Sequence, residues 1–305
     1  LMAFVITGQA WAATYDVTNG VGVSTYNSES LTIENYDALN ISGAWGSNTN
    51  VVLARDNNLT IKVGSINSDN ANKDVVFQAW DADLEIVTSG NIKLENFTNA
   101  FFSQPNGSLI LTANDVELKT EKVGNVIASW NMNQGDGSVT ALNVNNLSIE
   151  IENGTAISSR GVNYKTNESV PGKASVIIFA GGTVDVDAAR GITARSGVDS
   201  TKLATVEIVA NRVDIDSSVY GIGIEDFAKA DIKSDDININ VTDNSTNPVK
   251  AVYAVRNSSV VLEDSEITAT NNGSGSAYGI NLENKYAFPS ILEVIEQEVK
   301  EAMGL

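Results

Sequence analysis

The stretch SLTIENYDALNIS, residues 30–42, contains two short runs in which apolar and polar residues alternate. Alternation with a period of two is typical of a β-strand with one buried and one solvated face. The first run recurs as NLTIKV (58–63), DLEIVT (83–88), SLILTA (108–113), SVIIFA (175–180), TVEIVA (205–210) and SVVLED (259–264). This repetition, rather than any single motif, decides the fold.

Two further runs follow each copy of the first. The second reads ALNIS (38–42), NIKLE (91–95), DVELK (115–119), TVDVD (183–187) and RVDID (212–216). The third is richer in small residues and reads VVLARD (51–56), VFQAWD (76–81), VIASWN (126–131), GITARS (191–196) and GIGIED (221–226). Asn, Asp, Gly and Ser clusters such as NSDNAN (67–72) lie between the runs, and these are turn-forming residues.

Three short strands form a unit that repeats nine times at a spacing of roughly 24 to 35 residues. This pattern predicts an all-β fold, a right-handed parallel β-helix in which equivalent strands stack into three parallel sheets. An antiparallel sandwich or a propeller is the structural alternative, although a propeller blade needs about 40 residues and four strands. The prediction places one inward column at Leu31, Leu59, Leu84, Leu109, Val176, Val206 and Val260.

Composition limits the chemistry that the chain can perform. With 19 Lys and Arg against 38 Asp and Glu, the net charge is −19, which disfavours nucleic acids and anionic membranes as partners. Cysteine and histidine are absent, so disulfides, thiolate or imidazole metal sites and Ser-His-Asp catalysis are excluded.

These strand motifs, the Asn/Gly-rich turns and the lack of cysteine resemble the passenger domains of bacterial autotransporters and related β-helical surface adhesins. The resemblance covers about residues 13–285 and depends on the repeat, with no catalytic motif. It implies secretion, display at the bacterial cell surface and, commonly, adhesion. A C-terminal membrane barrel follows the passenger in that family, and the sequence given does not contain one.

Both ends of the chain depart from the repeat. The apolar start followed by Ala10, Ala12 and Ala13 is typical of the end of a signal peptide, so residues 1–12 are interpreted as a signal-peptide remnant. Residues 286–305 change to a helical pattern, with Pro289 ending the strand and Ser290 as N-cap. Apolar residues then recur every three or four positions, which predicts an amphipathic helix over 291–303 that caps the coil or forms a tail.

Two rows of side chains are candidate sites. Aligning the third strands gives one outward column, in which Trp and Arg are the residue types enriched at binding hot spots. That column contains Arg55, Trp80, Gln104, Trp130, Arg160, Arg195, Glu225, Val255 and Glu283. Its Trp and Arg members are the candidate ligand-binding residues, and the alternative is that these long side chains only cover the strand surface. Asp185, Asp187, Asp214 and Asp216 should stack in neighbouring coils as an acidic patch. Its oxygen atoms suit Ca²⁺, and the alternative is that they are exposed carboxylates that only solubilise the surface.

The function expected from these observations is that of a secreted, surface-displayed adhesin or structural passenger without catalytic activity. Its expected partners are host or bacterial surface glycans or proteins, with no membrane insertion in this segment and a monomeric state. No cofactor is expected apart from Ca²⁺ at the acidic patch. The alternative is a carbohydrate-active β-helix enzyme, a lyase or hydrolase, for which the adjacent pair Asp235 and Asp236 is the candidate acid and base. Adjacent strand residues point to opposite faces, so this pair suits a strand edge better.

Overall fold

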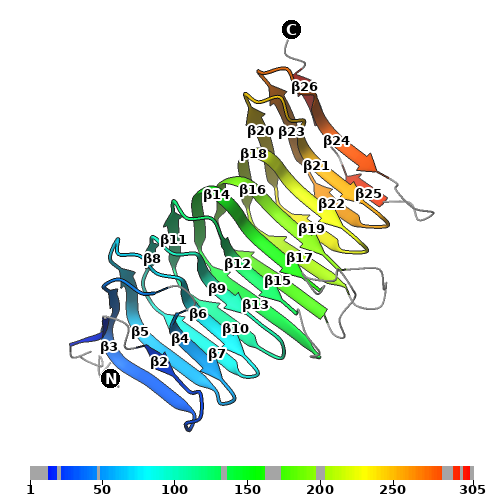
Figure 1. The fold of residues 1–305 in the computed structure, drawn as a ribbon. Helices are drawn as coiled ribbons and strands as arrows, with labels where there is room; N and C mark the ends of the chain where they lie inside the picture. Colours follow the sequence, from blue (N-terminus) through cyan, green and yellow to red (C-terminus); the bar gives the residue numbers. More distant parts are fainter. Residues whose placement is uncertain are drawn as a thin grey trace, which may run out of the picture.

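The chain forms a parallel β-solenoid of about nine turns in the computed structural model (Figure 1). The structure describes residues 13–18, 22–46, 49–131, 136–161, 173–196 and 203–283, and the backbone of two further strands at 291–295 and 298–302. Every regular element in these parts is a strand, and the named strand pairs are all parallel. The proposed signal-peptide remnant at 1–12 lies outside the described residues.

The strands stack into three faces, as the repeat predicts. The first face contains β3 (Leu31–Ser42), β5 (Leu59–Ser68), β7 (Asp83–Thr88), β10 (Ser108–Thr112), β13 (Gly137–Val144), β15 (Lys173–Ala180), β17 (Ala204–Val209), β19 (Lys229–Lys233), β22 (Ser259–Glu263) and β25 (Ile291–Ile295). The second contains β1 (Thr14–Thr18), the ends of β3 and β5, β8 (Ile92–Glu95), β11 (Asp115–Thr120), the starts of β14 (Asn146–Arg160), β16 (Thr183–Arg195) and β18 (Arg212–Glu225), β20 (Asp236–Asp243), β23 (Ser265–Asn271) and β26 (Glu298–Ala302). The third contains β2 (Val23–Ser24), β4 (Asn50–Arg55), β6 (Val75–Trp80), β9 (Asn99–Ser103), β12 (Asn125–Trp130), the ends of β14, β16 and β18, β21 (Val249–Val255) and β24 (Ala277–Glu283).

The predicted inward column of the first face is confirmed. Its seven members are aligned in register from β3 to β22, and Thr140 and Ala230 occupy the two positions that the sequence alignment left open. All members except Leu31 are buried, and Leu31 is 38% exposed. Leu31 is more exposed because β3 is the first described strand of this face and pairs, among the described strands, only with β5 there.

The third face has an equally regular inner column of larger side chains. Val52, Phe77, Phe101 and Ile127 occupy the same place on successive turns and are fully buried. The rings of Phe77 and Phe101 are stacked with centroids 5.6 Å apart. Burial of each such side chain contributes about 1.5–3 kcal/mol, so stacked turns are stabilised mainly by the turns next to them.

Three long strands, β14, β16 and β18, turn the corner from the second face to the third without a break in secondary structure. The ladders shift register at this corner, between Ile151 and Thr155 and again between Ala188 and Arg190. Glycine is required at the bend because a Cβ on Gly221 would lie 2.4 Å from a methyl carbon of Ile239. The corner therefore brings acidic second-face residues and third-face arginines onto the same strands.

The prediction of a C-terminal helix over 291–303 is wrong. Residues 291–295 and 298–302 form β25 and β26, which add one rung to the first and second faces by pairing with β22 and β23. The register places Leu292 opposite Val260 and Val294 opposite Leu262. A short apolar run satisfies both a helical and a strand period, and pairing with an open strand edge decides between them.

Candidate functional site

The outward column predicted on the third face is a real feature of the structure. Trp80 is in register with Arg55, Arg160 with Trp130, Arg195 with Arg160, and Glu225 with Arg195. Val255 and Glu283 continue the row, although Val255 is buried. Gln104 directly follows β9, whose last residue is paired with both flanking strands. The column therefore extends along most of the rod, with aromatic and basic residues at its N-terminal end and the middle.

At the N-terminal end, side chains of the column contact one another and a neighbouring tyrosine. The guanidinium carbon of Arg55 lies 4.2 Å from the ring centroid of Trp80 and 4.3 Å from that of Tyr26. A cation between two aromatic faces is already stabilised by both ring quadrupoles. Arg55 and Trp80 are thus engaged with each other, and the free surface that they offer to a ligand is small.

In the middle of the column Trp130 orients its neighbours. Its indole N–H donates to the hydroxyl of Ser158 at 3.3 Å, and the Thr193 hydroxyl lies 3.3 Å from the same oxygen. The guanidinium carbon of Arg160 is 5.6 Å from the Trp130 ring centroid. Burial, reinforced by the adjacent Arg195, lowers the pKa of Arg160. No described residue forms an ion pair with this arginine.

The next turn contains a charge network that sequence reasoning missed. Arg195 donates from Nε to the Asp226 carboxylate at 2.8 Å, and Arg256 forms a bidentate pair with the same carboxylate. Arg256 also reaches Glu225 at 3.1 Å. Although burial opposes ionisation, the hydrogen bonds from Arg256 and Arg195 hold the pKa of Asp226 below its ordinary value. Asp226 is the residue that fixes Arg195 in place.

The sequence position directly after each residue of the column could have identified Asp226. Asp56, Asp81 and Asp226 each directly follow a third strand and have positive φ angles of 64°, 51° and 54°. Asp and Asn are the residues other than glycine that most readily adopt this conformation. Arg256 occupies the equivalent place on the next turn, with a φ of 55°. Aligning this terminal position as well as the column would have paired Asp226 with Arg256.

Between these features lies a groove that we call the arginine groove. It has a volume of about 290 Å³, and its lining includes Ser158, Arg160, Arg190, Thr193, Arg195, Tyr220 and Glu225. Arg190 and Tyr220 come from the corner of β16 and β18, where they pair in register and the guanidinium carbon lies 5.7 Å from the ring centroid. The Tyr220 ring lies over Gly223, where a Cβ would approach the ring to 2.6 Å. Sequence alignment missed both residues because the register shift at the corner interrupts the alternation.

The four aspartates predicted to stack on the second face do so. Asp185 pairs with Asp214 and Asp187 with Asp216. Asp214 accepts from Arg212 and Asn238, and Asp216 accepts from Asn240 at 2.9 Å. Partial burial and the neighbouring carboxylates raise the pKa values of Asp185 and Asp187.

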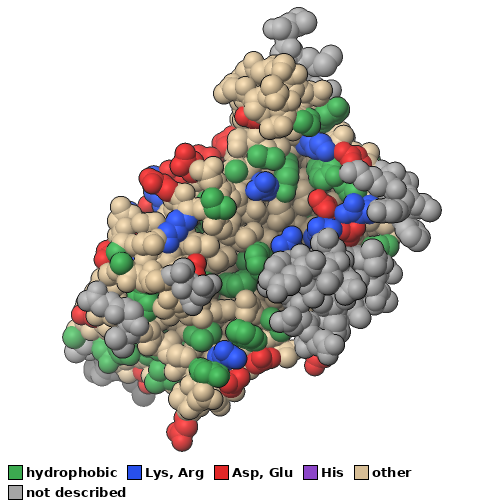
Figure 2. Space-filling model, in the orientation of Figure 1, with side chains coloured by type: hydrophobic (Ala, Val, Ile, Leu, Met, Phe, Trp, Pro, Cys, Tyr) green, Lys and Arg blue, Asp and Glu red, His purple; other side chains and the backbone are tan. Residues whose placement is uncertain are grey.

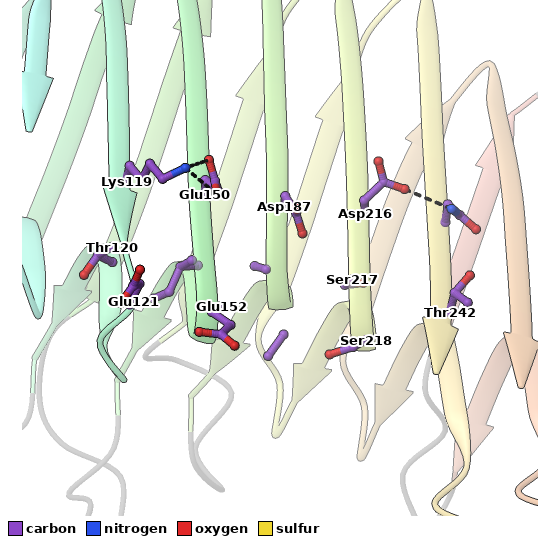
Figure 3. Close-up of a pocket in the computed structure, with 14 residues that line it drawn as sticks. Lys119, Thr120, Glu121, Glu150, Glu152, Asp187, Asp216, Ser217, Ser218 and Thr242 are labelled. Carbon is purple, nitrogen blue, oxygen red and sulfur yellow. Dashed lines mark hydrogen bonds and ion pairs between the residues drawn. The ribbon is translucent and has the colours of Figure 1, made fainter. Parts of the chain in front are cut away.

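The row that contains Asp187 and Asp216 forms what we call the acidic ladder. It runs in register through Lys119, Glu150, Asp187, Asp216 and Asn240. Figure 3 shows its labelled members at one level across consecutive strands, with Lys119 bonded to Glu150 at 2.7 Å. Asp187 lies between two carboxylates. The ladder lines a groove of about 500 Å³ together with Glu121, Glu152 and residues of the corner.

The described carboxylates do not gather into a metal site, and the adjacent pair Asp235 and Asp236 lies at the start of β20. No group of three or more Asp or Glu side chains within the described ranges could hold a metal ion together. Asp236 forms an ion pair with Arg212 at 3.2 Å, while Asp235 next to it is exposed. That pair therefore occupies the strand edge that the sequence favoured for it.

Charge on the outer surface comes in small groups. On the side drawn in Figure 2, basic side chains are separate spots between acidic side chains and wide areas of backbone and uncharged polar atoms. The described residues contain no helix long and apolar enough to cross a bilayer. No protein-family model, curated protein or solved structure matches the chain. The functional argument therefore depends on the geometry of these grooves.

Proposed function

We propose that this chain is the β-helical passenger of a secreted protein that is displayed on the bacterial cell surface and acts there as a non-catalytic adhesin. The coil is proposed to be right-handed, the hand of nearly all connections between parallel strands. The observation that carries the proposal is the outward column of the third face. A rod that presents aromatic and arginine side chains in register on successive turns offers an extended surface for a glycan or a protein.

The architecture supports this role physically. Each turn is stabilised by the turns next to it, so the rod can present one face at a fixed spacing of about 4.8 Å per rung. The net charge of −19 keeps such a rod soluble and disfavours anionic membranes and nucleic acids as partners. Such a rigid display suits adhesion at a surface, which needs no catalytic group.

The test has a location arm and a binding arm. Antibody labelling of intact cells of the source organism should detect the chain, and external protease should remove the signal. Purified protein should bind a panel of surface glycans and proteins without altering them. Labelling only after lysis would contradict surface display, and the absence of any bound partner would reduce the chain to a structural passenger.

The second candidate is a carbohydrate-active enzyme, and the acidic ladder is the observation that favours it. Asp187 and Asp216 occupy adjacent rungs beside a groove, and the raised pKa of Asp187 is a property that a general acid requires. Rungs about 4.8 Å apart are close to the carboxylate separation of retaining glycosidases, about 5–5.5 Å. Release of reducing ends or unsaturated sugars from acidic and neutral glycans, lost in Asp187→Asn, would establish this alternative over the adhesin.

A further inference from the structure

We propose that the arginine groove binds a sugar that carries a carboxylate, with Arg160 as the residue that recognises the acid. The inference rests on the proposed adhesin function and names the class of ligand for one part of the third face. It is carried by three observations, which are the unequal pairing of two stacked arginines, the fixed polar groups around them and the size of the groove.

The first observation is that two like charges are stacked and that, among the described residues, only Arg195 has a neutralising carboxylate. Arg160 and Arg195 are in register on adjacent strands, so their backbones are about 4.8 Å apart. Arg195 is paired with Asp226 at 2.8 Å and lies 3.7 Å from Glu225, whereas Arg160 has no ion-pair partner among the described residues. A partly buried, unpaired guanidinium is costly, and an anion entering the groove would remove that cost.

The second observation is that the groups around Arg160 are already positioned. Ser158 is held between the Trp130 indole N–H and the Thr193 hydroxyl, so its hydroxyl is oriented in the absence of ligand. On the opposite side, the Tyr220 ring lies against Gly223 with Arg190 over it. Hydroxyls, a planar cation and an aromatic ring are the groups that recognise the hydroxyls, the acid and the apolar face of a sugar.

The third observation concerns which anion fits. The groove of about 290 Å³ accommodates a ligand of about the size of a monosaccharide. A long polyanion such as nucleic acid would be repelled by a chain of net charge −19 outside the groove. A guanidinium matches the two oxygens of a carboxylate in a planar, bidentate geometry, which favours an acidic sugar at a chain end.

The experiment measures binding of purified protein to saccharides that end in a uronic or a sialic acid. Isothermal titration calorimetry and ligand-observed NMR would compare each acid with its uncharged amide analogue. We expect the acid to bind and Arg160→Gln to weaken binding by about tenfold or more, because one charge-assisted hydrogen-bonding pair is lost. The matched control is Arg212→Gln on the second face, an arginine paired with Asp214 and Asp236, which should leave binding unchanged.

Stability measurements separate recognition from a structural role. Because the unpaired charge is itself costly, the melting temperature of Arg160→Gln should equal or exceed that of the wild type. If this variant unfolds earlier, Tyr220→Ala provides a second test of the same groove, because it removes the ring while retaining all three arginines. Loss of acid binding in either variant supports the groove, and unchanged binding in both overturns it.

Two other results would also overturn the proposal. One is equal binding of the acid and its amide, and the other is full displacement of the saccharide by inorganic sulfate at equal concentration, which would indicate a general anion site. In either case adhesion of the wild-type protein to cells would still be measurable. Failure of the groove is therefore distinguishable from failure of the adhesin function, which requires that no partner is found for any face.

Discussion

The acidic ladder and the arginine groove are built on the same strands and have opposite charge. β14, β16 and β18 contribute Glu150, Asp187 and Asp216 on the second face, and after the corner they contribute Arg160 and Arg195 on the third. Stacking in register places like charges about 4.8 Å apart in both rows. The two faces differ in how those charges are satisfied, and this difference indicates which face is suited to receive a ligand.

Along the acidic ladder, most charges are satisfied within the ladder itself. Lys119 neutralises Glu150 and Asn240 donates to Asp216, whereas Asp187 between them has a carboxylate on each side. On the third face the neutralising carboxylate, Asp226, lies past the end of the row and reaches Arg195 but not Arg160. Each row therefore leaves one charge over, but of opposite sign: the ladder leaves Asp187 beside like charges, whereas the third face leaves Arg160 without an ion-pair partner among the described residues, which favours an anionic ligand there.

The largest effect should follow from disrupting the core beneath both faces. Val206 is 1% exposed and lies between Val176 and Ala230. Val206→Asp buries an unpaired charge and should cost about 4 kcal/mol or more, which would unfold the neighbouring turns. Circular dichroism and limited proteolysis would detect the loss.

The matched control for this core substitution is Val206→Ala, since alanine already occupies the same column at Ala230. It should cost only about 2 kcal/mol and retain the strand signal. Equal stability of Val206→Asp and wild type would contradict the parallel stacking of the first face.

A smaller effect should follow from removing the anchor of the arginine row. Asp226→Asn keeps a residue that tolerates a positive φ but removes the charge that holds Arg195 and Arg256. The Asp226 side chain is 6% exposed while both arginines are more open, so we expect a loss of about 2 kcal/mol. Thermal unfolding at neutral pH would measure it.

The pH dependence of stability tests whether the charge of Asp226 causes this loss. The pKa of Asp226 is lowered in the folded chain, so its stabilisation is complete above the pKa of the unfolded state and is lost as the pH falls through the folded pKa. Wild type and Asp226→Asn should therefore converge in stability in acid. A difference that stays constant down to that range would assign the effect to packing instead of charge.

The smallest effect should be a gain in stability on the acidic ladder. Asp187→Asn removes repulsion from Glu150 and Asp216 and should stabilise the chain by about 0.5 kcal/mol at neutral pH. The pKa of Asp187 is raised in the folded chain, so its ionised carboxylate destabilises the fold. This destabilisation is complete above the folded pKa and is lost as the pH falls through it. Differential scanning calorimetry at neutral and acidic pH would show a gain that shrinks in acid.

The control for the ladder is Glu85→Gln on the first face. Glu85 has Thr60 and Ile110 on the adjacent rungs, so removal of its charge relieves no direct repulsion. Its effect should be near zero at both pH values. An equal gain from both variants would indicate that net charge, and not the ladder, sets the stability.

Much of the fold could be predicted from the sequence because it is encoded locally. Period-two alternation in SLTIEN and its copies defined the strands, and the repeat aligned Leu59, Leu84 and Leu109 in one buried column. The same alignment predicts that Arg160 lies beside Arg195 and Asp187 beside Asp216, and the strand register agrees. A parallel stack transfers sequence register directly into spatial neighbours, so a repeat in the sequence becomes a ladder on the surface.

Other features depended on tertiary structure, for three physical reasons. The tail at 291–302 has an apolar pattern compatible with helix or strand, and pairing with β22 and β23 decided for strand. The corner between faces shifts the register, so Tyr220 and Arg190 meet at a place that alternation does not predict. Whether a charge is paired depends on residues past the strand ends. Only the folded chain brings Asp226 to Arg195 while leaving Arg160 without an ion-pair partner among the described residues.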